Sequence, residues 1–93
     1  NDEVLIGAVQ ALEDFGSEAI SVGFDAMPSA IAAIKSGRVD ATVAQFPRAM
    51  GALAVQALYD DLQGKELTSK TVLDPVLVIQ ENVESYAEPF KDY

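Results

Sequence analysis

Apolar residues recur along three segments of the chain with the three- and four-residue spacing that puts them on one face of a helix. The first segment covers residues 2–15, the second runs from Pro28 to Gly37, and the third runs from Pro47 to Gly64. Proline suits the first position of a helix because the N–H that it lacks would be unpaired there, and glycine commonly ends a helix. The pattern therefore predicts three helices, two of them opened by proline.

Three shorter apolar runs follow these helices, at residues 19–24, 40–44 and 72–79. They are too short for helices and are bounded by turn-forming residues, which is typical of buried strands. Pro75 cannot donate to a ladder, so we expect it at the start of the last strand or on an edge. Helices that alternate with strands in this way predict an α/β fold with a parallel sheet and right-handed crossovers.

A sheet of three parallel strands would be incomplete, because both of its faces and both of its edges need cover. We therefore expect further strands on the N-terminal side. A strand entering Asn1 would bring this residue level with the tips of the other strands. The chain also opens on Asn1 rather than on methionine, as a fragment or a processed product does. The predicted fold class is α/β, a three-layer parallel sheet flanked by helices that is incomplete in this chain.

Composition excludes several kinds of function. The 93 residues contain no cysteine and no histidine, which rules out disulfides, thiolate or imidazole metal sites, cysteine nucleophiles and Ser-His-Asp relays. The formal net charge of −9 argues against nucleic acid as a partner, because phosphate binding needs clustered lysine and arginine. No glycine-rich phosphate loop and no calcium loop occurs. The sequence therefore predicts no catalytic residue, no metal and no cofactor.

Two polar residues stand directly after the first two predicted strands. Asp25 follows the first strand and Gln45 the second, and open parallel sheets bind ligands in the crevice beyond such strand ends. A carboxylate accepts bonds from two neighbouring hydroxyls, and an amide both donates and accepts. The pair therefore favours hydrogen-bonded recognition of a polar ligand. Other roles stay open: Asp25 as a helix cap or turn acid, Gln45 as a partner of loop backbone, and Asn1 as a helix cap.

Asp25 also begins the run Asp-Ala-Met-Pro, which is similar to the phosphoacceptor segment of response-regulator receiver domains. In that family the Met-Pro pair normally lies one residue further from the aspartate. The acidic pair expected near the first strand is absent here, and no lysine ends a later strand. A phosphorylated aspartate is therefore a minor alternative.

The chain resembles a known family along most of its length. Residues 22–58 read VGFDAMPSAIAAIKSGRVDATVAQFPRAMGALAVQAL. This run is similar to the C-terminal part of the ribose-binding-protein-like sugar-binding proteins of bacterial ABC transporters, which are type 1 periplasmic binding proteins. The opening Asn1-Asp2-Glu3 and the ending VLVIQENV, residues 76–83, resemble segments of the family in the same order. The family's N-terminal lobe and the first half of its C-terminal lobe have no counterpart here.

The resemblance implies a function and three site residues. Members of this family have two α/β lobes joined by a hinge and hold a monosaccharide between them. An asparagine, an aspartate and a glutamine that bond sugar hydroxyls occupy the positions matched here by Asn1, Asp25 and Gln45. By implication the chain is a sugar-binding, non-enzymatic part of an importer whose partner is an ABC transporter permease. The implied location is the periplasm, or the cell exterior on a lipid anchor.

The resemblance also implies that residues 1–93 are a C-terminal fragment of a two-lobe protein. Residues 1–45 and about 71–83 would belong to the C-terminal lobe, and the helix in residues 46–70 would pack on the missing N-terminal lobe. Without that lobe we expect self-association, since unpaired strand edges and apolar helix faces find each other in a second copy. The ligand-sensing core of lac-repressor-type transcription regulators, which shares the fold, stays as the alternative function.

Overall fold

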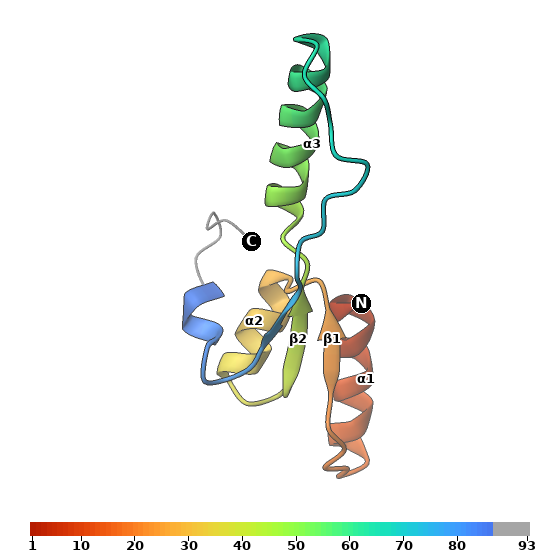
Figure 1. Cartoon of the computed structure of the whole chain (residues 1–93). Coiled ribbons are helices and arrows are strands. Elements are labelled where there is room, and N and C mark those ends of the chain that lie inside the picture. The colour runs from red at the N-terminus through yellow and green to blue at the C-terminus, as the bar shows by residue number, and fades with distance from the viewer. Residues whose placement is uncertain (87–93) are drawn as a thin grey trace.

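The computed structural model describes residues 1–86, and residues 87–93 lie outside the described part of the chain. The elements follow in the order α1 (Asp2–Asp14), β1 (Val22–Phe24), α2 (Pro28–Lys35), β2 (Ala41–Ala44), α3 (Pro47–Leu62), β3 (Val76–Val78) and the short 3₁₀ helix η1 (Val83–Tyr86) (Figure 1). The three predicted helices and three predicted strands are all present in the predicted order. The first and last strands are shorter than expected, because pairing begins only at Val22 and Val76. Pro75 stands directly before β3, as predicted.

The three strands form one sheet in the order β1-β2-β3. β1 and β2 run parallel, with Gly23 beside Thr42, as predicted. β3 runs antiparallel to β2, with Val78 beside Thr42, so the prediction of an all-parallel sheet is wrong for the last strand. Figure 1 shows the cause: α3 extends away from the tip of β2, and residues 63–75 return along it instead of crossing a face of the sheet. The chain therefore re-enters the sheet at the end where it left.

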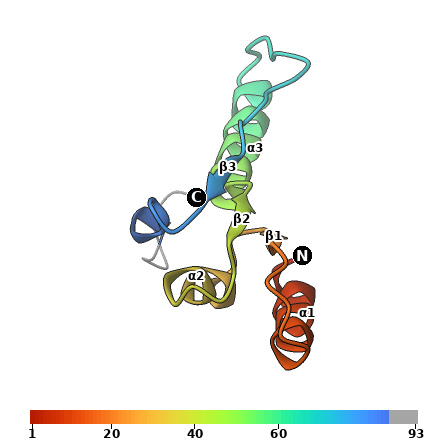
Figure 2. The same ribbon diagram turned by 90° about the horizontal axis from the view of Figure 1, so that it is seen from below.

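α1 and α2 cover the same face of the sheet (Figure 2). The core lies between these helices, the sheet and η1, and its largest fully buried apolar side chains are Ile34, Val78 and Val83. The opposite face of the sheet is open in residues 1–86. Three apolar side chains on that face are 52%, 45% and 52% exposed, namely Val22, Phe24 and Leu77. The described residues thus hold the sheet and one of its two helical layers, as expected for a three-layer architecture that is incomplete in this chain.

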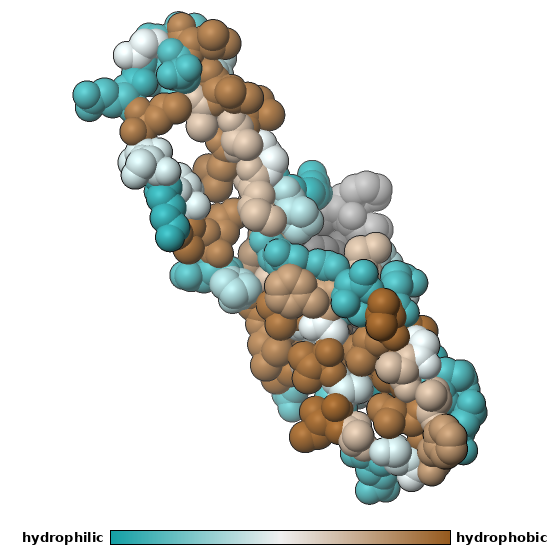
Figure 3. All heavy atoms as spheres, turned by 90° about the vertical axis from the view of Figure 1, so that its right-hand side faces the viewer, coloured by the Kyte–Doolittle hydropathy of each residue, from teal (hydrophilic) through white to brown (hydrophobic). Residues whose placement is uncertain are grey.

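Residues 46–75, which comprise α3 and the segment that returns along it, form an arm that extends from the rest of the fold (Figure 1). None of the residues of α3 is buried. Figure 3 shows hydrophobic side chains gathered on this arm. A groove of about 300 Å³ lies between α3 and the return segment, lined by Met50, Leu53, Ala54, Ala57, Thr71 and Leu73. No helix within residues 1–86, α3 included, has the length and hydrophobicity needed to cross a membrane.

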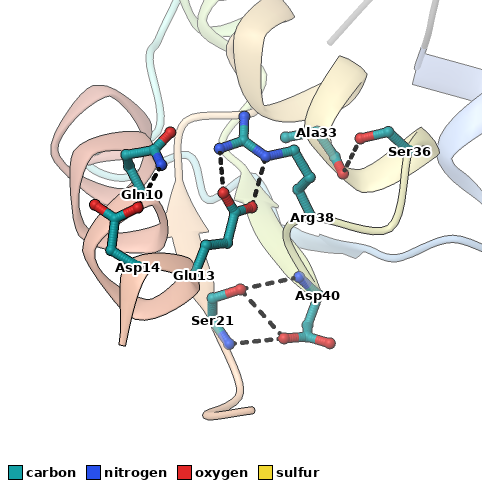
Figure 4. A network of polar contacts seen from close by, with 8 residues as sticks. All are labelled: Gln10, Glu13, Asp14, Ser21, Ala33, Ser36, Arg38 and Asp40. Atoms are coloured by element: carbon teal, nitrogen blue, oxygen red, sulfur yellow. Dashed lines mark hydrogen bonds and ion pairs between the residues drawn. The ribbon is translucent and has the colours of Figure 1, made fainter. Parts of the chain in front are cut away.

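At the end of the fold opposite the strand tips, polar contacts join α1 to the segment before β2, and the residues before β1 and β2 to each other (Figure 4). Arg38 donates two hydrogen bonds to the carboxylate of Glu13, at 2.7 and 3.1 Å, and the N–H of Ser21 donates to Asp40 at 2.8 Å. The hydrogen bonds from Arg38 lower the pKa of Glu13. This contact therefore stabilises the fold at neutral pH and is lost as the pH falls through that lowered pKa. Glu13 and Arg38 are both exposed, so the contribution to stability is small.

We expect the isolated 93-residue chain to self-associate, because a second copy would cover the open sheet face and the apolar arm. Sedimentation velocity should give a mass above the 9.9 kDa of the monomer, rising with concentration. Leu77→Ser, on the open face, should weaken this association. Thr68→Ser, on the exposed return segment, serves as the control and should leave the association unchanged. A compact monomer at every concentration would contradict the prediction.

Candidate ligand-binding site

The structure brings Asp25 and Gln45 together at the tips of the two parallel strands. Each residue directly follows its strand, β1 or β2. The Nε2 of Gln45 donates a hydrogen bond to Asp25 Oδ1 at 2.6 Å, and both residues are half-buried. The N–H of Asp25 donates to the carbonyl of Val43 at 2.8 Å, which continues the ladder past the end of β1. The expected proximity of the two residues is confirmed, and their role in ligand binding stays a prediction.

Unusual backbone conformations cluster at these same tips. Among residues 1–86, the residues other than glycine with positive φ are Asp25 at 111°, Ala26 at 55° and Phe46 at 60°. Residues other than glycine rarely adopt this backbone region, and holding one of them there costs about 1–3 kcal/mol of stability. Strain of this kind persists only where the surrounding structure holds it in place, and it gathers at binding and catalytic sites. The strained positions therefore point to the end of the sheet that carries Asp25 and Gln45.

Asn1 begins α1 as its cap. Its Oδ1 accepts a hydrogen bond from the N–H of Val4 at 3.1 Å, and the residue is exposed. The helix-cap interpretation is thus confirmed. The N-terminus lies at the same end of the fold as the tips of β1 and β2 (Figure 1). No hydrogen bond within the described residues joins Asn1 to Asp25 or Gln45, and its role as a third ligand-binding residue stays a prediction.

Asp2, the residue after the cap, is fully buried. Its Oδ1 accepts a hydrogen bond from Thr42 Oγ1 at 2.7 Å, and its Oδ2 accepts one from the N–H of Met27 at 2.7 Å. Thr42 Oγ1 in turn accepts from the N–H of Ala26 at 3.2 Å. In the sequence, Asp2 is recognisable only as an acid in the first turn of a helix, which is a common position for an acid. The one signal of its burial is Gly23, a residue without a side chain in the strand that faces it.

Apolar residues flank Asp25 and Gln45 along the chain. Phe46 is half-buried and packs against the core, whereas Met27 and Phe24 are 42% and 45% exposed. Apolar walls around a few polar groups are usual in small-molecule sites. The carboxylates nearby do not form a metal site, since no group of three or more potential ligands comes together within the described range. The arrangement suits a neutral polar molecule held by hydrogen bonds.

Comparison of the sequence with known proteins gives consistent matches. The family model described as periplasmic binding protein domain matches residues 1–66. The ribose import binding protein of Bacillus subtilis is 41% identical over 76 residues, which cover 82% of this chain and 25% of that protein. The ribose import binding protein of Escherichia coli K12 is 37% identical over 82 residues, which cover 87% of this chain and 28% of that protein.

Solved structures agree with the sequence matches. An ABC transporter periplasmic solute binding protein from Actinobacillus succinogenes, with bound D-allose, superposes with a TM-score of 0.85 at 33% identity and covers 92% of this chain and 31% of that one. An ABC transporter solute binding protein from Bacillus halodurans, with bound myo-inositol, gives a TM-score of 0.82 at 37% identity, with coverage of 94% and 31%. The α/β fold is therefore the fold of periplasmic binding proteins.

The chain belongs to the periplasmic binding protein family, and the curated relatives named above are ribose import binding proteins. The resemblance inferred from residues 22–58 is thereby confirmed. The chain spans about a quarter of the length of these curated relatives, 25% and 28%. The relatives are binding proteins rather than enzymes, and they are components of sugar import.

Proposed function

We propose that this chain supplies one side of a monosaccharide site in a solute-binding protein of an ABC importer, and that Asn1, Asp25 and Gln45 bond the sugar hydroxyls. The observation that supports this best is the Asp25–Gln45 contact of 2.6 Å at adjacent strand tips. Both tips carry strained backbone, at Asp25 and Phe46. The relatives bind ribose, D-allose or myo-inositol, which all present rings with several hydroxyls.

The chemistry of the pair suits such a ring. Gln45 already donates to Asp25 Oδ1, so the second oxygen of this carboxylate and the amide oxygen of Gln45 are acceptors that a sugar hydroxyl can use. A carboxylate forms charge-assisted bonds with hydroxyls that are about twice as strong as neutral ones. Phe24 directly precedes Asp25 and Met27 follows it by two residues, and both are partly exposed and provide apolar surface for a ring face.

The division of the chain between two lobes forms part of the same proposal. Residues 1–45 and 71–83 include α1, α2 and the sheet, which share one core. Residues 46–70 contain α3, none of whose residues is buried. We assign α3 to contact with the N-terminal lobe of a two-lobe protein, where its exposed apolar side chains would be covered.

The relatives support a partner and a location for this proposal. Solute-binding proteins of this kind deliver their ligand to an ABC transporter permease, and we propose the same partner and a periplasmic location for the protein that contains this chain. The ligand leaves unchanged, because binding and release are the whole function. Nucleic acid is no partner in this proposal, in keeping with the net charge of −9.

Calorimetric titration of the complete gene product that contains these residues tests the proposal. We expect D-ribose, D-allose or myo-inositol to bind with a dissociation constant of about 1 μM or below, since several hydroxyl bonds act together. Cyclohexanol, a ring with one hydroxyl, is the control ligand and should give no heat of binding. The proposal fails if none of the three polyhydroxylated ligands binds at millimolar concentration.

A further inference from the structure

We infer that Asp2 and Thr42 are positioning residues, which hold the strained turn that carries Asp25 and so fix Asp25 relative to Asn1 and Gln45. The inference rests on the proposed sugar site. It adds to that site two fully buried side chains that act through the backbone. They need not touch the ligand.

The turn after β1 is the feature that requires holding. Asp25 and Ala26 have φ values of 111° and 55°, so two consecutive residues occupy a region that favours glycine, and neither is glycine. A free chain of this sequence would leave that conformation. The surrounding structure must therefore supply the contacts that keep it.

Two buried side chains supply those contacts. The N–H of Ala26 donates to Thr42 Oγ1 at 3.2 Å, and the N–H of Met27 donates to Asp2 Oδ2 at 2.7 Å. These are the two N–H groups that directly follow Asp25 in the chain. The turn is thus fixed just after its binding residue, by groups that no solvent reaches.

The same two side chains connect all three segments of the proposed site. Asp2 follows Asn1 at the start of α1, and Thr42 lies on β2, three residues before Gln45. The Oγ1 of Thr42 donates to Asp2 Oδ1 at 2.7 Å and closes the connection. No buried side-chain nitrogen or oxygen atom in the described residues lacks a partner. The hydroxyl donates once and accepts once, and each carboxylate oxygen has a donor, so the arrangement is fully satisfied.

The carboxylate of Asp2 occupies the space where a side chain at position 23 would lie, and residue 23 is glycine. A Cβ at Gly23 would overlap Asp2 Oδ1 and would lie 3.2 Å from Asp2 Cγ. The carboxylate therefore lies directly against the backbone of β1, one residue before the strand ends. This close approach places it within reach of Thr42 and Met27 at once.

Substitutions at Thr42, made in the complete gene product, test the inference. Thr42→Val keeps the shape of the side chain but removes the hydroxyl, and Thr42→Ser keeps the hydroxyl. Hydrogen exchange is read by mass spectrometry on peptides that cover residues 24–28, and D-ribose binding is read by calorimetry. We expect Thr42→Val to speed exchange in these peptides and to weaken binding about tenfold, because one buried hydrogen bond to the turn is lost. Thr42→Ser should restore both.

A core variant separates positioning from general stability. Ile34→Val, in the fully buried core of α2, lowers stability but removes none of the hydrogen bonds that Thr42 and Asp2 make with the turn. It should leave exchange at residues 24–28 and ribose affinity at the wild-type values. Asp2→Asn should weaken binding as Thr42→Val does, and the double variant should be no worse than the more impaired single variant, since both act on one turn.

The outcomes distinguish this inference from the proposed function. If the wild type binds no sugar but Thr42→Val exposes the turn to exchange, the proposed function fails and the holding of the turn stands. If Thr42→Val leaves exchange at residues 24–28 unchanged, the positioning role is overturned whatever the ligand. If the turn is exposed and ribose affinity stays at the wild-type value, the role in the site is likewise overturned.

Discussion

Gly23→Ala is expected to destabilise the fold by about 3 kcal/mol or more, since it expels the carboxylate of Asp2. The new Cβ would overlap Asp2 Oδ1 and would lie 3.0 Å from Leu5 Cδ2. Asp2 has a short side chain and two hydrogen bonds, so it cannot make room without breaking them. The hydroxyl of Thr42 and the N–H of Met27 would then lose their acceptor. Chemical denaturation of the complete gene product measures the loss.

Gly7→Ala is the matched control for this substitution. Gly7 lies on the exposed side of α1, and a Cβ there would meet nothing within 4 Å. Alanine is a better helix former than glycine, so this variant should be more stable than the wild type by about 0.5–1 kcal/mol. A Gly23→Ala protein as stable as the wild type would show that Asp2 does not occupy the space beside β1.

Asp25→Ala should weaken monosaccharide binding by about 100-fold or more while the protein stays folded. Removing the carboxylate deletes charge-assisted acceptors worth about 1.5–3 kcal/mol each, and 1.4 kcal/mol corresponds to a factor of ten in affinity. Gln45 would also lose the acceptor that orients its amide at 2.6 Å. Calorimetric titration with D-ribose, or with whichever of the three ligands binds most tightly, measures the effect.

Asp14→Ala provides the control, because it breaks a similar contact elsewhere. Gln10 Nε2 donates to Asp14 Oδ1 at 3.1 Å on the exposed surface of α1, away from the strand tips (Figure 4). This variant should bind the sugar as tightly as the wild type. Equal affinity of the Asp25→Ala and Asp14→Ala proteins would remove Asp25 from the proposed site.

The local elements of the fold were predictable because their signals are local. Pro28 and Pro47 open α2 and α3, and the apolar period marks the faces of the helices. The direction of β3 was not predictable in this way. It depends on the path of residues 63–75, which return along α3 and bring the chain back to the end of the sheet that it left. Alternation of helices and strands carries no information about that path.

The geometry of the candidate site was predictable in part for a related reason. Asp25 and Gln45 directly follow their strands, so the parallel pairing of β1 and β2 alone brings them together. The contact between Asp2 and Thr42 joins residues 40 positions apart. An acid at a helix start is normally exposed, and only the packing of α1 against β1 decides that this one is buried. Long-range packing of this kind leaves almost no trace in a single sequence.

The return of the chain has a mechanical consequence for the arm. Ala44 and Val76 are paired neighbours in the sheet, so the arm leaves and rejoins the body through two backbone strands that lie side by side. Two adjacent connections resist twisting but bend together about the line that runs through them. A rotation of the arm would therefore be confined to one axis, the line through these two connections. Gln45 directly follows β2 and so stands at the first of these connections, in contact with Asp25.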